Sequence, residues 1–258
     1  MAVTCYLSGR WGNIIFHLAH MIAYAKKYDL KYYVPLEADA YKGFTGDNKV
    51  PFIVNSTGEK PINPIIYKEP NMAKGIPRCH EIPKLDNVLF DGYWQSFLWF
   101  DWCRDYILET FNFPYEKEVG MTSISVRRGD CVGVPAFPIA PLEYYQNAVR
   151  YMQERGFNKF KVHSDDLEWC KTAFTKENFG DAEIEFYEGH TERENYLSLC
   201  NCENNITARS TFSLTAAWFN RNPQKIVCVP TVRHSWWNTQ NADLIPEYFT
   251  QIDFKNPF

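Results

Sequence analysis

The stretch MTSISVRRGD, residues 121–130, places two adjacent arginines directly after a short pattern typical of a buried β-strand. From this stretch towards the C-terminus, strand-like apolar runs alternate with segments of helical periodicity. The predicted strands are residues 123–126, 159–163, 183–187, 205–208 and 226–230. The predicted helices are residues 141–154, 167–176, 192–200 and 212–220. Such alternation implies a parallel sheet that is covered on both faces, and the ligands of such sheets bind beyond the carboxyl ends of the strands.

The N-terminal half opens in the same order, with a strand, a glycine-containing loop and a helix. The predicted elements are strands at residues 3–7, 31–35 and 88–93 and helices at residues 14–28 and 97–111. Residues 36–88 are rich in Pro, Gly, Asn and Lys, which predicts irregular segments that shape a cleft. We therefore predict an α/β fold with two domains, residues 1–117 and 118–258.

The composition narrows the class of partner. The chain has 258 residues, of which 45% are hydrophobic, and its net charge is -4 without a basic block. These values allow a sizeable core and argue against nucleic acid or an anionic membrane as the main partner. Residues 1–9 lack the pattern of a signal peptide, and no apolar run is long enough for a transmembrane helix. We expect a cytoplasmic protein, at most peripheral at the inner membrane face.

The eight cysteines are expected to be reduced thiols in or near the core, because the chain is long and shows no secretion signal. Their spacing does not match a zinc knuckle, and Cys79 and His80 form an isolated pair in the sequence. We expect neither a bound metal nor a cofactor, and the sequence leaves the oligomeric state open.

The motif SVRRGD, residues 125–130, carries the strongest chemical signal. Arg127 and Arg128 are costly at a strand end unless they meet an anion, and a guanidinium can bind two phosphate oxygens at once. We expect one arginine to reach a diphosphate and the other to pair internally. Asp130 is expected to orient the arginines or to bind a ligand hydroxyl. The alternative is an ion pair within the protein.

Two further motifs follow predicted strands and begin predicted helices. Their polar residues can cap the helix. In the first motif they can also accept hydrogen bonds from a nucleobase or ribose; in the second, the backbone N–H groups and the helix dipole can bind an anion. The residues of the first motif are Ser164, Asp165 and Asp166, and those of the second are Ser210, Thr211, Phe212 and Ser213. In the opening loop, Arg10 and Asn13 likewise stand at the start of a helix.

Taken together and in this order, the motifs resemble the α-1,2-fucosyltransferases of glycosyltransferase family 11. The resemblance extends from residue 6 to about residue 237. The matching motifs are GRWGN at 9–13 with Phe16, DGYWQS at 91–96, VRRGD at 126–130, SDD at 164–166 with Trp169, Leu199 with Cys200, STFS at 210–213, and Ala217 with Trp218.

The resemblance implies a GT-B fold, in which an acceptor-side N-terminal domain and a donor-binding C-terminal domain, both Rossmann-like with parallel sheets, face each other. It implies GDP-fucose as the donor, a galactoside of a glycan as the acceptor, inversion at the anomeric carbon and no required metal. The sequence contains no Asp-x-Asp, by which metal-dependent transferases commonly hold the metal. The residues implied at the donor are Arg127 at the diphosphate, Asp165 or Asp166 near the nucleoside, residues 210–213 around the phosphates, and Arg10 and Asn13 across the cleft.

The sequence departs from the family pattern at three places. Ser125 stands where the family usually has His, Ile14 where it has Gln, and Leu214 with Thr215 where it has two tryptophans. These changes leave room for a transferase that uses a different GDP-sugar. The sequence also leaves open a catalytically silent GDP- or glycan-binding protein, and a scaffold that does not bind GDP.

For the reaction itself, Arg127 is expected to stabilise the charge of the leaving diphosphate. The candidates for a general base are Asp130, His17 and Asp91. The acceptor is expected near Asp91, Tyr93 and Gln95, whose alternative role is packing at a strand end.

Overall fold

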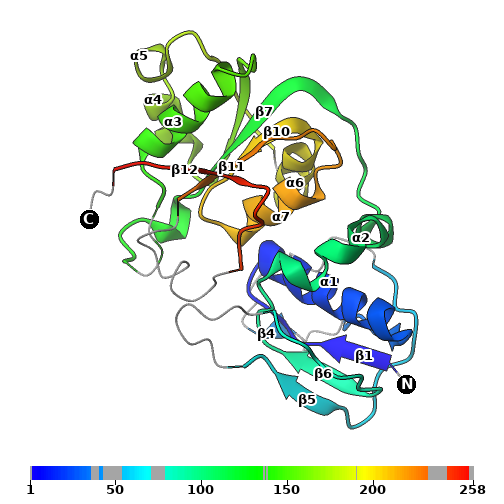
Figure 1. Ribbon diagram of the computed structural model, residues 1–258. Coiled ribbons are helices and arrows are strands. Elements are labelled where there is room, and N and C mark those ends of the chain that lie inside the picture. Colours follow the sequence, from blue (N-terminus) through cyan, green and yellow to red (C-terminus); the bar gives the residue numbers. More distant parts are fainter. Residues whose placement is uncertain are drawn as a thin grey trace. The chain divides into compact units, whose positions relative to one another are not determined.

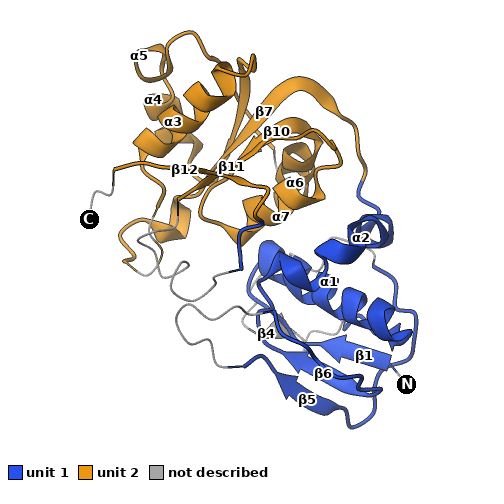
Figure 2. Cartoon of the chain, in the orientation of Figure 1, with its two compact units in different colours: residues 1–113, 237–246 blue, residues 114–236, 247–258 orange. Residues whose placement is uncertain are grey.

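The computed structural model describes residues 2–35, 54–70, 79–135, 137, 139–189, 191–231 and 243–255, together with the backbone of residues 41–42. The chain divides into two compact units (Figure 2). Unit 1 comprises Met1–Phe113 and Trp237–Pro246, and unit 2 comprises Pro114–Trp236 and Glu247–Phe258. Within the described ranges, none of the helices has the length and apolar character needed to cross a membrane.

The chain returns to unit 1 near its end, which the uninterrupted domain predicted for residues 118–258 did not include. The carboxylate of Asp243 accepts a hydrogen bond from the backbone N–H of Cys79 (2.8 Å), and its carbonyl accepts one from the Ser96 hydroxyl (3.2 Å). These contacts join residues that are 164 and 147 positions apart. Local sequence patterns carry no signal at such separations, so the prediction missed the return.

Unit 2 is built on a six-stranded, all-parallel sheet with the order β12-β11-β10-β7-β8-β9. Its strands are β7 (Glu118–Val126), β8 (Lys159–Ser164), β9 (Glu183–Phe186), β10 (Cys202–Ile206), β11 (Val227–Pro230) and β12 (Thr250–Ile252). The chain moves outward from β7 to β9, crosses back to β10 beside β7, and then moves outward in the opposite direction. This is the Rossmann strand order. The predicted parallel sheet is confirmed; the short edge strand β12 was not predicted.

Helices cover both faces of this sheet (Figure 1). They are α3 (Leu142–Gln153), α4 (Leu167–Ala173), α5 (Lys176–Phe179), α6 (Glu192–Asn201) and α7 (Thr211–Phe219). The α3 face carries the apolar core, where Ile124 and Val126 of β7 pack with Tyr144 and Tyr145. The helix predicted at residues 167–176 ends at Ala173, because Phe174 leaves the helical conformation with ψ 61°, and the short α5 that follows was not predicted.

The opposite face of the sheet is unusually polar and is held by a hydrogen-bond network around Asn205 of β10. The Asn205 amide donates to the Ser123 hydroxyl (2.8 Å) and to the carbonyl of Leu199 in α6 (2.7 Å). Its carbonyl accepts a hydrogen bond from the amide of Asn220 after α7 (2.8 Å). The network therefore joins β7, β10, α6 and the end of α7, and it fixes how the two central strands sit beneath the helices.

Unit 1 contains a second parallel sheet, of order β3-β1-β6-β5, and a two-stranded pair, β2-β4. Its strands are β1 (Ala2–Cys5), β2 (Leu7–Ser8), β3 (Lys31–Tyr32), β4 (Tyr41–Lys42), β5 (Ile65–Lys68) and β6 (Val88–Asp91). Its helices are α1 (Trp11–Tyr28), α2 (Arg104–Phe111) and the 3-10 turns η2 (Phe97–Trp99) and η3 (Asp101–Cys103). The α/β class is thus confirmed in both units.

Three differences from the predicted elements lie in unit 1. The helix expected at residues 97–111 is broken into η2, η3 and the shorter α2. Strand β5 lies inside residues 36–88, which were predicted to be irregular. Helix α1 begins at Trp11, earlier than predicted, and is buried all along its length from Ile14 to Ala25. A helix buried on all sides has no polar face, so His17 and His20 are enclosed within the unit.

Candidate functional site

The strand order of unit 2 reverses between β7 and β10, which places the ends of these two strands at the topological switch point. Ile206 of β10 lies opposite Ile124 of β7 in a parallel register. Arg127 lies three residues beyond Ile124, and Arg209 lies three residues beyond Ile206, so the two arginines leave the sheet at the same level. Parallel sheets of this kind bind ligands at this edge.

Arg127 forms ion pairs with two carboxylates, Asp165 in the loop after β8 and Asp130 in the turn η4 (Gly129–Cys131). Burial acts to lower the pKa of the Arg127 guanidinium, but Asp165 and Asp130 raise it by more, so the group is firmly charged. A quarter of the Arg127 side chain is exposed, and Asp130 is half exposed. The guanidinium therefore lies at the surface of the edge, held between its two partners.

Arg128 is positioned by Trp169 and Asp166. Its guanidinium carbon lies 3.9 Å from the centre of the indole ring, and its Nε donates to Asp166 Oδ2 (3.0 Å). Its backbone N–H donates to Asp165 Oδ1 (2.8 Å). We expected only one arginine to pair internally, but both do, because the loop after β8 supplies two adjacent carboxylates.

The loop after β8 serves as both a helix cap and an arginine clamp. Asp166 Oδ1 accepts a hydrogen bond from the Trp169 backbone (3.2 Å) and caps α4, while the Ser164 hydroxyl accepts one from the Asp166 N–H (2.9 Å). A Cβ atom at Gly129 would lie 2.5 Å from Asp165 Oδ2, so this close approach requires glycine. The ion pair within the protein, one of the two alternatives for the arginines, is present. The cap was expected from Ser164 or Asp165, but Asp166 makes it.

At the start of α7 the side chains of the second motif mostly support the turn itself. Ser210 caps the helix by accepting from the Phe212 N–H (3.3 Å). Ser213 is 2% exposed and donates to the carbonyl of Ser210 (3.2 Å), and the Phe212 ring packs edge-on against Tyr196. Thr211 is half-buried in the first turn. A ligand at this helix would therefore meet backbone N–H groups and Ser210 or Thr211, with Ser213 and Phe212 behind them.

Arg209 is the residue that the sequence reasoning missed. In the described part of the chain it has no carboxylate partner; its Nη2 donates weakly to the carbonyl of Thr231 (3.4 Å), and its Nε is buried without a hydrogen bond. The guanidinium lies 5.3 Å from the ring of Phe254. Burial lowers the pKa of Arg209, an effect that Tyr145 and Tyr144 oppose. Its signal in the sequence was its position as the one cation in the motif ARSTFS.

Two tyrosines of α3 lie beneath these arginines and hold the strand ends together. Tyr144 donates to the carbonyls of Thr207 (2.8 Å) and Cys228 (3.1 Å), and Tyr145 donates to the carbonyl of Ser125 (3.3 Å). The pKa of the Tyr145 hydroxyl is raised by burial and responds to both Arg128 and Arg209, so the charges of the two strand ends act on one side chain. The two strand ends therefore form one charged region, in which Arg209 is the arginine without a carboxylate partner among the described residues.

The candidate residues of unit 1 form a separate group. Asn13 Oδ1 accepts a hydrogen bond from the amide of Gln95 (2.8 Å), and Gln95 is only 8% exposed, so Gln95 holds Asn13 and does not itself reach outward. Gly9, with φ 74°, allows this arrangement because a Cβ atom there would lie 2.2 Å from Asn13 Nδ2. Arg10 and Tyr93 are exposed.

Two more candidate residues of unit 1 are Asp91 and His17. Asp91 is half-buried at the carboxyl end of β6, and its contact with an acceptor stays a prediction. His17 is fully buried, and burial lowers its pKa to about 3. It accepts a hydrogen bond from the Ser8 N–H (3.4 Å). An enclosed ring that resists protonation does not fit a general base for a bound acceptor, so the expectation for His17 was wrong.

The strand order defines unit 2 as a Rossmann-type α/β unit, and its switch point, where Arg127 and Arg209 lie, is the candidate anion site. Residues 2–250 match glycosyl transferase family 11, so the chain belongs to that family.

Two curated relatives come from Escherichia coli. One is named alpha-1,2-colitosyltransferase and is 32% identical over 185 residues, which cover 65% of this chain and 63% of the relative. The second is named O-antigen biosynthesis glycosyltransferase WbnK and is 29% identical over 164 residues, covering 54% of this chain and 53% of the relative. The chain thus spans less than two thirds of the length of either relative.

Among solved structures, a complex of POFUT1 with GDP-fucose covers 87% of this chain and 95% of its own, at 12% identity and a TM-score of 0.42. The match to the NodZ alpha-1,6-fucosyltransferase soaked with GDP-fucose covers 86% of this chain and 91% of the NodZ chain, at 12% identity and a TM-score of 0.40. Because both scores are low, the fold assignment rests on the strand order of each unit.

Proposed function

We propose that this protein is an inverting, metal-independent glycosyltransferase that moves fucose from GDP-fucose to a hydroxyl of an acceptor glycan, in α-1,2 linkage to a galactoside. Membership of glycosyl transferase family 11 supports the reaction class. The observation that carries the donor assignment is the gathering of Arg127, Arg128 and Arg209 at the switch point of unit 2. A diphosphate is the ligand whose charge and geometry match several guanidinium groups.

In the reaction, the bond between the anomeric carbon and the β-phosphate oxygen breaks, and its electron pair stays on the diphosphate. The acceptor oxygen attacks the opposite face of the sugar, forms the new glycosidic bond and loses its proton. Arg127 and Arg209 then face the growing negative charge. A preorganised donor of this kind contributes about 10²–10³ in rate. Asp130, half exposed beside Arg127, is our candidate for the base that takes the proton.

The remaining parts of the proposal concern the acceptor and the conditions of the reaction. Unit 1 supplies the acceptor side, with Asn13, Arg10, Asp91 and Tyr93 as the candidate contacts. The proposal includes the absence of a required metal or cofactor and a cytoplasmic location.

A second donor is favoured by one observation. The more similar of the two Escherichia coli relatives is named for colitose transfer, and this chain differs from the fucosyltransferase pattern at Ser125 and Ile14. Side-by-side rates with GDP-fucose and GDP-colitose decide between the two sugars, and the faster reaction names the donor.

The first test is calorimetric titration of the full chain with GDP in the absence of metal. We expect binding by the wild type and a loss of about tenfold to a hundredfold in affinity for Arg209→Ala, since a hydrogen bond to a charged group is worth about 1.5–3 kcal/mol. Arg127→Ala should lose at least as much, because it also leaves Asp165 and Asp130 facing the phosphates without a cation.

Arg150→Ala is the matched control. Arg150 is an exposed arginine on α3 whose Nη1 donates only to Asn147 Oδ1 (3.4 Å), so its removal changes the net charge equally but leaves the switch point intact. Its GDP affinity should equal that of the wild type. Failure of the wild type to bind GDP, or equal losses in all three variants, contradicts a diphosphate site at the switch point.

A further inference from the structure

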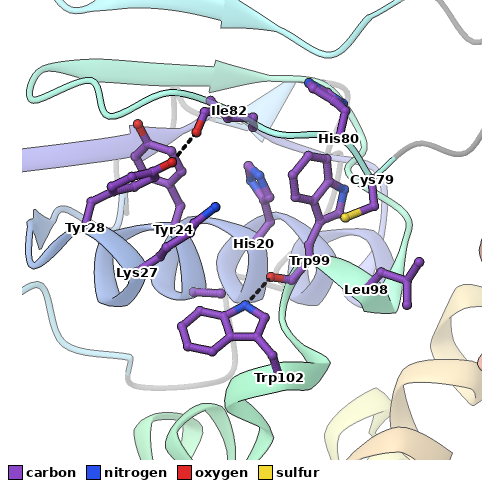
Figure 3. A pocket seen from close by; sticks show the side chains of 11 residues that line it. His20, Tyr24, Lys27, Tyr28, Cys79, His80, Ile82, Leu98, Trp99 and Trp102 are labelled. Atoms are coloured by element: carbon purple, nitrogen blue, oxygen red, sulfur yellow. Dashed lines mark hydrogen bonds between the residues drawn. The ribbon is translucent and has the colours of Figure 1, made fainter.

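Unit 1 carries a pocket that the proposed function does not use. It has a volume of about 370 Å³, which is within the range of small-molecule sites (Figure 3). Its walls are helix α1, residues 79–82 and the turns η2 and η3. All of its lining residues belong to unit 1, whereas the candidate diphosphate site belongs to unit 2.

The pocket contains buried polar atoms that lack hydrogen-bond partners. His20 is 1% exposed, and neither of its ring nitrogens has a partner among the described residues; the same holds for the buried indole Nε1 of Trp99. His20 points from α1 into the space between Tyr24 and Trp99 (Figure 3). Each unpaired buried group costs about 1–3 kcal/mol, so a ligand that pairs with them gains that free energy.

The His20 ring is rigidly held and neutral. It stacks on Trp94 with ring centres 4.2 Å apart and meets the edge of Trp99 at 4.7 Å. Burial, with smaller contributions from His17 and His80, lowers its pKa well below the ordinary value. A neutral imidazole offers one N–H donor and one bare nitrogen acceptor, and Trp99 adds a second donor. A hydroxyl group, which both donates and accepts, matches this set.

The two tyrosine hydroxyls of the pocket are already occupied. The Tyr24 hydroxyl donates to the carbonyl of Pro83 (2.7 Å), and the Tyr28 hydroxyl donates to the carbonyl of Ile82. Among the described residues that line the pocket there is no carboxylate, and the one lysine or arginine is Lys27, an exposed side chain at the rim. The described lining therefore offers no carboxylate to a cationic ligand, and a pure hydrocarbon would leave His20 unpaired.

A flat apolar surface completes the site. The Trp102 side chain is 56% exposed, and its indole N–H donates to the carbonyl of Trp99 (3.0 Å), which fixes the orientation of the ring. Leu98 beside it is also 56% exposed. An exposed, immobilised aromatic face next to unpaired donors and acceptors suits a ring that has an apolar C–H face and hydroxyl groups at its edge.

We propose that this pocket binds one pyranose unit of the acceptor glycan, with hydroxyl groups on His20 and Trp99 and a C–H face on Trp102. The inference rests on the proposed function for the class of ligand, since a glycosyltransferase must hold a glycan. The acceptor contacts expected so far are Asp91 and Tyr93, at the end of β6. The pocket adds His20, Trp99 and Trp102 to them.

The test uses the full chain and three glycosides, methyl β-galactoside, methyl β-glucoside and methyl β-N-acetylgalactosaminide, observed by saturation-transfer NMR and tryptophan fluorescence. We expect transfer to the C–H protons of at least one glycoside. His20→Phe keeps the stacked ring and removes both hydrogen bonds, so it should weaken binding at least tenfold. Trp102→Ala removes the apolar face and should do the same.

Tyr248→Ala is the matched control, because Tyr248 is an equally exposed aromatic (56%) in unit 2, and glycoside binding should not change. GDP binding should be the same in all three variants. His20→Phe removes two unpaired nitrogens from the interior, so we expect it to fold, and Trp102 is exposed enough for its variant to fold in any case.

Two results overturn the proposal: no glycoside binds to the wild type, or glycosides bind equally to the wild type and to both pocket variants. The donor assignment fails separately. A wild type that binds GDP but no glycoside contradicts only the pocket, and one that binds a glycoside but no GDP contradicts only the switch-point site.

Discussion

Arg127 and Arg209 follow neighbouring strands at the same level of the sheet, but they differ in their carboxylate partners. Arg127 is shared by Asp130 and Asp165, whereas Arg209 has no carboxylate in the described part of the chain. A diphosphate must compete with carboxylates for Arg127 but not for Arg209. At the scale of single residues, the open question is whether Asp130 only holds Arg127 or also accepts a proton.

Asp130→Asn separates these roles, because it keeps the shape of the side chain and removes its charge. If Asp130 is the base, transfer should fall by about 10²–10⁴, while GDP affinity stays within about threefold of the wild type or rises as Arg127 is released. Rates with saturating donor and acceptor, measured beside GDP titrations, check this. Asp181→Asn, at an exposed turn, is the control. Unchanged transfer in Asp130→Asn rules out Asp130 as the base.

At the scale of elements, the position of β10 beside β7 decides where Arg209 lies. The polar network of Asn205 holds this pair of strands to α6 and α7. Asn205→Ala leaves Ser123 and the Leu199 carbonyl without that partner inside the unit, so we expect it to lower the free energy of unfolding by about 3 kcal/mol. Urea denaturation measures the loss.

Asn147→Ala removes one exposed amide, which donates to the carbonyl of Asp253 (2.9 Å), and should cost less than about 0.5 kcal/mol. If the two asparagine variants are equally stable, the network does not hold the strands. If Asn205→Ala is unstable as expected, its GDP affinity should fall as well, since Arg209 follows the same strand.

At the scale of the whole molecule, both units contain enclosed histidines, and this makes the protein sensitive to mild acid. Burial lowers the pKa of His17 and of His163 to about 3, and that of His20 well below its ordinary value. In the unfolded chain these rings titrate near pH 6.5. Their contribution to stability is therefore complete above about pH 6.5 and is lost progressively as the pH falls from there towards 3.

Each such histidine should reduce the free energy of unfolding by about 1.4 kcal/mol between about pH 7.5 and pH 5.5. Urea midpoints at these pH values measure the change. The His163 ring shares a hydrogen bond with the Ser198 hydroxyl (2.9 Å), so His163→Gln keeps a polar partner there. This variant should lose less free energy of unfolding on acidification than the wild type, by the amount that one histidine contributes. Equal midpoints at both pH values contradict the prediction.

Much of unit 2 could be predicted from local patterns. The strands that end at Val126, Ser164 and Ile206 and the helices after them have clear periodicity, and the motifs at their ends are continuous in sequence. The predicted helix at residues 97–111 failed because aromatic residues at helical spacing do not distinguish one helix from successive tight turns.

By itself, the sequence determined the α/β class, the parallel sheet of unit 2 and the arginine and aspartate motifs at the strand ends, because these depend on the order and spacing of neighbouring residues. Only the tertiary structure decided which charges are neutralised, that Gln95 supports Asn13, and that His20 and Trp99 leave unpaired atoms in one pocket. The physical reason is that burial and pairing are set by residues far apart in the chain, and no local pattern records which of them meet.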